Sequence, residues 1–467
     1  MRRVSFIATV MIFAAAVGAA PIGAQVAHAV RSDETELVPF WKQLGDTTLE
    51  RLTREALRAN NDVRAAQANV RSARTARKLV AFDFAPTITA NTGVLRHRYS
   101  AAQLPGASAA LRQQDVYDAG FDASWEVDVF GRVRSAYAAQ DAIAASAGED
   151  LRDVQLSLVS ELARAYFELR GAQRQFVVAT QNAANQKRTL QLTVDRLSAG
   201  RGTAFDRERA SAQVSTTLAG ITATEARIAS ATYRIGVLSG SMQRIPPLAP
   251  IPAQEEEGTA DTSYVLPAAP DFASVEHLVA RRPDVRSAER RLAAQGAFVN
   301  VARADYLPRL NVIGSVGYNA GGSELLGRKE SSRYVIGPVI SWPAFDLGRV
   351  RTRVEVARAQ VDESRAHYEQ TVLQARAEGE NAIVAYDRAR TRVVFLREAA
   401  RASERGAELA RLRLDGGEAD FLEVLDAQRT RLDAEDRLAQ GETDAATAFL
   451  ALYKALGGAW AGSGGSR

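Results

Sequence analysis

Proline is missing from two long stretches of the chain, and this restricts the fold more than any other feature of the sequence. The chain has 467 residues and 14 prolines, but residues 106–245 and 344–467 contain none. Six of the 14 prolines lie between Pro246 and Pro270. Because a proline costs about 3 kcal/mol in a helix interior, this distribution predicts long helices in both proline-free stretches and one irregular linker between them.

The first half of the chain is repeated in the second half. Short motifs return in the same order, as the following pairs of ranges show. They are 61–64 with 282–286, 85–86 with 307–308, 130–134 with 347–351, 196–200 with 413–417, and 233–240 with 453–458. Chance explains one such match but not five in order. We therefore expect an internal two-fold repeat in which each half reads helix, strand, loop, strand, long helix, turn, helix.

Apolar residues in the proline-free stretches recur at helical spacing. Leu151, Val154, Leu158 and Leu162 follow one another every three or four residues, which is the period of a helix with one apolar face. The predicted helices span about 134–195 and 204–238 in the first repeat and about 350–414 and 420–456 in the second. A helix of roughly 60 residues is about 90 Å long, so we expect these helices to pack along one another as coiled coils.

Four shorter segments alternate between apolar and polar residues, as strands with two different faces do. They span about 86–99, 116–128, 307–318 and 334–343. In the second segment, Phe121 and Trp125 fall on one face, and Asp118 and Asp122 fall on the other. Strands of about ten residues with an apolar face and terminal aromatic residues are typical of transmembrane β-barrels. A half-buried sheet of a soluble domain gives the same alternation, so the strands alone leave both interpretations open.

The number of strands limits how they could cross a membrane. Four strands are too few to close a barrel, and an open sheet edge cannot lie in hydrocarbon. Several chains must therefore share one barrel if these strands span a membrane. Bacterial barrels start at about eight strands, which leaves two, three or four copies. The acidic face of 116–128 would then line a water-filled lumen, and the long helices would continue the barrel as a tube.

The composition argues against an enzyme and against nucleic-acid binding. The chain has no cysteine and only four histidines, none of them at ligand spacing from another, and it has no glycine-rich phosphate loop. Its 59 basic residues alternate with 55 acidic ones and form no basic stripe. We therefore expect no catalytic residues, no cofactor, no metal site and no nucleic-acid partner.

Residues 1–29 have the features of a secretory signal peptide. Arg2 and Arg3 precede an apolar run over 4–20, and Ala27-His28-Ala29 provides a cleavage site. No later segment has 18 consecutive apolar residues, so we expect no membrane-spanning helix there. The expected organisation is a signal peptide (1–29), a first repeat (30–240), a proline-rich linker (241–272), a second repeat (273–458) and a flexible C-terminal tail (459–467).

Four motifs resemble those of one known family. They are WEVDVFGR at 125–132, AYFELRGAQ at 165–173, LDAQR at 425–429 and ALYKALGGAW at 451–460. Together with the repeat, they resemble the TolC/OprM-type outer membrane efflux proteins, in particular the NodT-like subgroup that serves resistance-nodulation-division (RND) pumps. The resemblance implies a mixed α/β membrane protein, a homotrimer with four strands per copy in one outer-membrane β-barrel. It also implies an α-helical coiled-coil barrel in the periplasm, with an equatorial region built from the linker and the chain ends.

The same resemblance implies a function. Such a protein is the outer membrane channel of a tripartite efflux system in a Gram-negative bacterium, a passive gated duct that exports drugs or solvents. Its expected partners are a periplasmic adaptor (membrane fusion) protein, an inner-membrane RND pump and outer-membrane lipids. A duct for metal-ion efflux or type I secretion is one alternative, and a soluble periplasmic coiled-coil scaffold is another. Members of the subgroup usually carry a lipidated cysteine, which this sequence lacks.

The resemblance places a periplasmic gate near the start of the last helix. Similar proteins are closed by rings of a leucine, an aspartate and an arginine, and the matching residues are Leu422, Asp426 and Arg429. Their i, i+4, i+7 spacing puts them on one helical face. A leucine ring would be an apolar constriction, whereas an aspartate ring needs a basic neighbour such as Arg429 or Arg209. Asp420 is a candidate for a second acidic ring, and the alternative for all of them is an ordinary solvated helix face.

Two glycine-rich turns connect the paired helices. They contain Gly200, Arg201 and Gly202 in the first repeat and Gly416, Gly417 and Glu418 in the second. By the same resemblance, these turns are the tips of the tube and contact the adaptor. Glycines at such positions also end helices as C-caps, and both roles are compatible.

Overall fold

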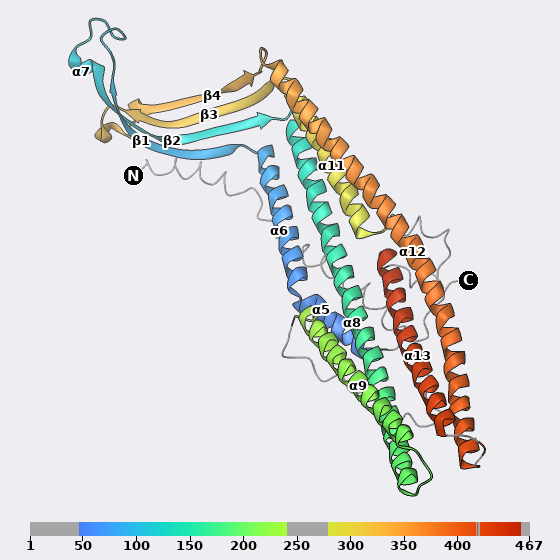
Figure 1. Ribbon diagram of the computed structural model, residues 1–467. Coiled ribbons are helices and arrows are strands. Elements are labelled where there is room, and N and C mark those ends of the chain that lie inside the picture. Colours follow the sequence, from blue (N-terminus) through green and yellow to red (C-terminus); the bar gives the residue numbers. More distant parts are fainter. Residues whose placement is uncertain (1–45, 241–278, 417, 419–420, 459–467) are drawn as a thin grey trace. The chain divides into compact units, whose positions relative to one another are not determined.

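The computed structural model describes residues 46–240, 279–416, 418 and 421–458 (Figure 1). The predicted signal peptide (1–29), linker (241–272) and tail (459–467) lie outside the described residues, as do Gly417 and Asp420. The chain divides into two compact units. The strand unit comprises residues 64–153 and 279–377, and the helical unit comprises the described parts of 1–63, 154–278 and 378–467.

The strand unit contains an antiparallel sheet with the order β1-β2-β3-β4. Its strands are β1 (Thr87–Arg98), β2 (Gln113–Val127), β3 (Arg309–Ala320) and β4 (Ser332–Ser341). β2 begins before the predicted residue 116 because the short helix α7 (Ala109–Arg112) ends directly at Gln113. Within the described part of the chain, β1 and β4 each pair with one strand only, so the sheet has two open edges.

The strand register gives the sheet one apolar and one polar face. Ala90, Phe121, Val316 and Tyr334 are partners in one row across the four strands. Because successive residues of a strand point to opposite faces, every second row belongs to the same face. Tyr334, Ile336 and Ile340 on this face are between 71% and 80% exposed in the single chain. An apolar face of this extent requires an apolar environment outside the chain.

Two tryptophans at equivalent places of the repeats bound the apolar face at one end of the sheet. The indole N–H of Trp125 donates to the carbonyl of Phe84 at 3.1 Å, and that of Trp342 donates to the carbonyl of Tyr306 at 3.0 Å. Each bond connects the end of one strand to the segment just before its hairpin partner. The amphipathic indole is suited to a membrane–water interface.

Asp128 connects the sheet to helix α8 (Arg132–Ser198). Its carboxylate accepts hydrogen bonds from the backbone N–H groups of Val133 at 3.1 Å and Arg134 at 3.0 Å. Burial alone would raise the pKa of Asp128, but these hydrogen bonds and the Arg134 side chain outweigh it and lower the pKa below its ordinary 3.8. Because Asp128 satisfies N–H groups that the first helical turn leaves free, the helix begins at Arg132, before the predicted residue 134.

Replacing Asp128 by alanine should lower the free energy of unfolding by about 1 kcal/mol at pH 7. The pKa of Asp128 is lowered in the folded chain, so its contribution is complete above the pKa of the unfolded chain and is lost as the pH falls through the folded pKa. The difference between wild type and Asp128→Ala should therefore shrink below the ordinary pKa of 3.8. Denaturant unfolding of both proteins in detergent, from pH 7 downward, measures this difference in the free energy of unfolding. A difference that stayed constant over that range would contradict a role of the charged carboxylate.

The helices of the strand unit are joined by polar contacts. They are α6 (Asn61–Ala81), α11 (Pro283–Ala304) and the first parts of α8 and α12 (Leu347–Asp415). The hydroxyl groups of Ser146 and Ser287 lie 3.0 Å apart, and Ser287 also donates to Asp150 at 2.5 Å. Arg291 pairs with the same Asp150 at 2.7 Å. These contacts connect α11 of the second repeat to α8 of the first.

The helical unit is a bundle around an apolar core. It contains α5 (Thr47–Ala59), α9 (Ala204–Leu238), α13 (Phe421–Ala455) and the later parts of α8 and α12, and Figure 1 shows α9 alongside α8 and α13 alongside α12. Tyr166, Tyr386, Phe449 and Tyr453 are fully buried. The rings of Tyr386 and Phe449 lie 5.5 Å apart and connect α12 to α13.

Helix α13 contacts both long helices of the bundle. Glu442 of α13 accepts from Arg174 of α8 at 3.1 Å and from Arg397 of α12 at 3.0 Å. A Cβ on Gly171 of α8 would lie 2.0 Å from the hydroxyl of Thr443, so these two helices approach closely at a glycine. No helix among the described residues has the length and apolar character needed to cross a membrane.

Candidate functional site

The turn between α8 and α9 is closed by hydrogen bonds at both helix ends. Gly200 has a φ of +68°, its N–H donates to Leu197 at 3.0 Å, and the N–H of Arg201 donates to Arg196 at 2.9 Å. This is the Schellman pattern, which needs a left-handed residue and therefore favours glycine. A Cβ on Gly202 would lie 3.2 Å from the backbone nitrogen of Leu197, so Gly202 packs against the end of α8.

Helix α9 starts with a capping box directly after this turn. The Thr203 hydroxyl accepts from the backbone N–H of Asp206 at 3.1 Å, and the Asp206 carboxylate accepts from the backbone N–H of Thr203 at 3.2 Å. Such reciprocal bonds satisfy two N–H groups that a helix start leaves free. The first predicted tip is thus a well-defined turn with Gly200 and Arg201 exposed.

The turn between α12 and α13 has a different construction. The N–H of Gly416 donates to Leu412 at 3.0 Å, and the N–H of Glu418 donates to Arg413 at 2.8 Å. Arg413 forms an ion pair with Glu423, which connects the last turn of α12 to the first turn of α13. Gly416 and Glu418 are exposed.

The predicted gate residues lie on the first turns of α13. Leu422 is half-buried, whereas Asp426 and Arg429 are exposed. The other face of this segment packs within the chain, since Val424 is 4% exposed. In the described part of the chain, no salt bridge joins Asp426 to Arg429 or to Arg209, which is exposed on α9. Within the described ranges, the charges of Asp426 and Arg429 therefore have no salt-bridge partner in the same chain.

Arg431 anchors the packed face of α13 next to the predicted gate. It pairs with Glu404 of α12 at 3.0 Å and with Glu435 of its own helix at 2.6 Å. Burial would lower the pKa of Arg431, but the hydrogen bond to Glu435 and the charges of both glutamates raise it. Arg431 therefore stays charged and holds α13 against α12, which fixes the direction of the gate face.

The polar face of the sheet carries a second set of functional groups. The Arg333 guanidinium of β4 donates to Asp118 of β2 at 3.0 and 2.8 Å and to the Ser315 hydroxyl at 2.6 Å. It reaches across β3 because its register partner there, Gly317, has no side chain. The Asn91 amide of β1 donates to Asp122 of the adjacent strand β2, two residues from its own register partner Gly120.

The sequence predicted the acidic residues of this face but not their partners. Arg333 lies in the second repeat, and its contact with Asp118 depends on the register between β2, β3 and β4. The alternation within each strand places both residues on polar faces, and that is the signal from which the pair could have been found. The register between the repeats could not be read from either strand alone.

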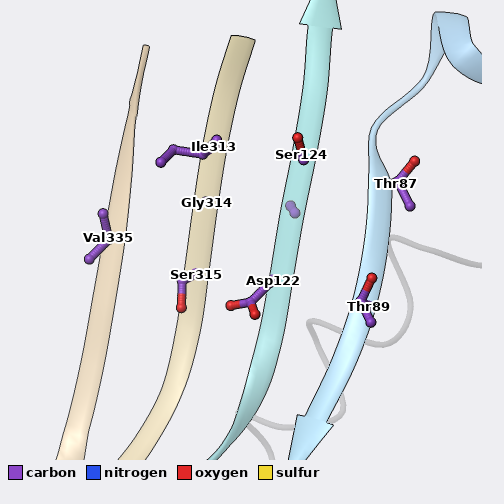
Figure 2. A pocket seen from close by; sticks show the side chains of 9 residues that line it. Thr87, Thr89, Asp122, Ser124, Ile313, Gly314, Ser315 and Val335 are labelled. Atoms are coloured by element: carbon purple, nitrogen blue, oxygen red, sulfur yellow. The ribbon is translucent and has the colours of Figure 1, made fainter. Parts of the chain in front are cut away.

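A hollow of about 310 Å³ lies on the polar face next to Asp122 (Figure 2). Figure 2 shows side chains from all four strands around it, with the Asp122 carboxylate extending toward Ser315. It is lined by Thr87, Thr89, Asp122, Ala123, Ser124, Ile313, Gly314, Ser315 and Val335. Among the described residues, no group of three His, Cys, Asp or Glu side chains could hold a metal ion.

Comparisons by sequence and by structure both find outer membrane proteins similar to this chain. A family model described as "Outer membrane efflux protein" matches residues 52–241 and 275–458. The pyoverdine export outer membrane protein OpmQ of Pseudomonas aeruginosa is 28% identical over 449 residues, which cover 95% of this chain and 92% of OpmQ. The outer membrane protein OprJ of the same species is 29% identical over 422 residues, 90% of this chain and 86% of OprJ.

A solved structure of the outer-membrane channel OprN resembles the structure of this chain. The TM-score is 0.80 with 39% sequence identity, over 90% of this chain and 92% of OprN. The sheet and the long helices are therefore those of an outer-membrane channel with a β-barrel and a helical barrel. Because the family model covers most of both repeats, the chain belongs to the outer membrane efflux protein family and is the outer-membrane channel component of an efflux system.

Proposed function

We propose that the chain acts as a homotrimer and forms a passive gated duct. Each copy contributes its four strands to one shared barrel and its long helices to a periplasmic tube. The observation that carries the proposal is the sheet itself, which has an exposed apolar face, a polar face and two open edges. Hydrocarbon tolerates neither unpaired strand edges nor polar groups, so other copies must complete the sheet around the polar side.

The family resemblance supports three copies. The strand count allows two, three or four, since bacterial barrels start at about eight strands. Proteins of the TolC/OprM type have three copies, and this chain shares their repeat and motifs. The adjacent edges would be β1 of one copy and β4 of the next, which run antiparallel as the strands within each copy do.

Leu422, Asp426 and Arg429 would close the duct at its periplasmic end. The structure supports this assignment by leaving Asp426 and Arg429 exposed and without an intrachain salt bridge among the described residues, while the opposite face of α13 is packed. Three-fold symmetry would bring the three leucines together and place the basic partner of Asp426, Arg429 or Arg209, on a neighbouring copy. Asp420 would add a second acidic ring.

The partners are a periplasmic adaptor protein at the two helix turns and an inner-membrane RND pump. The tips that would contact the adaptor contain Gly200, Arg201 and Gly202 and Gly416, Gly417 and Glu418. Energy comes from the pump, so the chain has no bond chemistry, no cofactor and no metal of its own. Lipids of the outer membrane would surround the apolar face of the sheet.

The exported compounds are small organic molecules such as drugs or solvents. The name of OpmQ assigns the export of pyoverdine to that relative. Metal-ion efflux or type I secretion remains the alternative, because the pump determines most of the specificity.

Cross-linking across the barrel edges tests the trimer. The natural chain has no cysteine, so Thr92→Cys on β1 and Ile336→Cys on β4, both on the apolar face, provide unique reactive groups. A flexible bismaleimide should convert the double variant into covalent species of up to three chains on a denaturing gel. Each single variant should give no species larger than one chain. A ladder that ended at two chains or continued to four would contradict the trimer.

A further inference from the structure

The hollow beside Asp122 is built from two adjacent rows of the polar face. One row consists of Thr89, Asp122, Ser315 and Val335, and the next row consists of Thr87, Ser124, Ile313 and Gly337. All but Gly337 line the hollow. The hollow lies within the sheet of a single copy, so it does not depend on residues from another chain.

The two carboxylates of this part of the sheet differ in their neighbours. Asp118 receives both hydrogen bonds of the Arg333 fork, so its charge is neutralised. Asp122 receives a hydrogen bond from the neutral amide of Asn91. Among the described residues, Arg333 forms its salt bridge with Asp118 and not with Asp122. The group of two aspartates and one arginine thus keeps one negative charge, which is located at the hollow.

The rest of the hollow combines hydroxyl groups with an apolar wall. Thr89 and Ser315 are the register partners of Asp122 on either side, and their oxygens can accept or donate hydrogen bonds. Ile313 is 39% exposed and Val335 is 57% exposed, and both lie next to Asp122 and Ser315 on the mainly polar face. A ligand there would meet a carboxylate and hydroxyls at one end and aliphatic side chains at the other.

We propose that this hollow is a transit site for amphipathic organic cations, which are ammonium compounds with an alkyl or aryl group. The ammonium would lie against Asp122, and the apolar group would lie against Ile313 and Val335. The proposal rests on the proposed function, because the polar face is inside the duct only when the barrel is closed. A volume of about 310 Å³ suits a small ligand.

The chemistry of the hollow discriminates against other solutes. A divalent metal ion prefers several carboxylate or imidazole ligands, and the hollow offers one carboxylate. An anion would be repelled by Asp122, because the nearby Arg333 is already paired with Asp118. A neutral solute would gain the apolar contact but not the charge-assisted one.

Saturation-transfer difference NMR with benzyltrimethylammonium tests the proposal on the full chain in nanodiscs. The aryl protons of this probe report weak binding, and empty nanodiscs give the background. Asp122→Asn should weaken binding about tenfold, since it removes a charge-assisted contact without changing shape. Val335→Thr, which keeps the shape but adds a hydroxyl, should weaken binding roughly threefold.

Asp115→Asn is the matched control. Asp115 lies on the same strand but on the opposite face, where it pairs with Arg96, so this variant should bind the probe like wild type. Unchanged binding in Asp122→Asn, or equal weakening in both aspartate variants, would overturn the proposal. The bismaleimide cross-link of the Thr92→Cys and Ile336→Cys variant distinguishes a failure of the site from a failure of the duct. A cross-linked trimer without probe binding retains the duct and contradicts the site, whereas Asp122-dependent binding without a cross-linked trimer retains the site and contradicts the shared barrel.

Discussion

Replacing Leu422 and Asp426 together by alanine should raise the conductance of the detergent-extracted protein in a planar bilayer by roughly tenfold, the factor that corresponds to about 1.4 kcal/mol. The wild-type duct should conduct poorly, because a ring of leucines excludes water from a narrow passage. Alanine removes most of this apolar volume. Loss of Asp426 also removes the electrostatic attraction that would hold its ring to basic groups of a neighbouring copy.

The structure supports this prediction by the way α13 is oriented. Val424 is buried and Arg431 pairs with Glu404 of α12, so the packed face of the helix is the one opposite Asp426. The double substitution therefore removes one half-buried and one exposed side chain from the face opposite the packed one. A large change of conductance would have to come from contacts between copies, and not from unfolding of the helix pair.

A matched double variant at the end of α12 is the control. Glu408→Ala with Leu412→Ala likewise removes one acidic side chain and one leucine at i, i+4 spacing, and both side chains are exposed. Its conductance should stay at the wild-type level. High conductance of the wild type, unchanged in the gate variant, would retain the duct but contradict the gate. An equal increase in both double variants would indicate a general loosening of the helix ends.

The strands and helices could be predicted from the sequence because their signals are local. The alternation of Leu310, Val312 and Val316 with polar residues depends only on neighbouring positions, and the same is true of the helical spacing in the proline-free stretches. The prediction of the efflux family is confirmed by the family model. The start of α8 was predicted too late because Asp128, which lies outside the helix, supplies the cap.

The contacts between distant segments could not be predicted, since they depend on register and packing. Arg333 and Asp118 are far apart in the sequence and meet only because three strands pair in one particular register. The close approach of Gly171 and Thr443 connects the two repeats in the same way. The predicted gate depends on contacts of another type, namely contacts between copies, because the counter-ions of Asp426 would come from another copy. Neither the sequence nor a single chain supplies the geometry of that ring.

The paired glycines of β2 and β3 show how the close approach of two strands restricts a single residue to glycine. Gly120 and Gly317 are register partners on the polar face. A Cβ on Gly317 would lie 2.4 Å from the carbonyl oxygen of Ala119 and 2.6 Å from the Cα of Gly120. Both are backbone atoms, so no side-chain rotation can relieve the overlap. Any side chain at residue 317 must therefore push β2 and β3 apart where Arg333 crosses to Asp118.

We expect Gly317→Ala to lower the free energy of unfolding in detergent by about 1–3 kcal/mol, the usual cost of overpacking, and to reduce the amount of assembled protein in the outer membrane. Gly314→Ala is the control because it makes the same substitution in the same strand on the opposite face. A Cβ there would lie 3.8 Å from that of Ala123, an ordinary contact distance. Equal destabilisation of both variants would mean that β3 merely disfavours alanine. A stable Gly317→Ala variant would mean that β2 and β3 can separate at this row. The Arg333–Asp118 pair would then have to form without the close approach of these two strands.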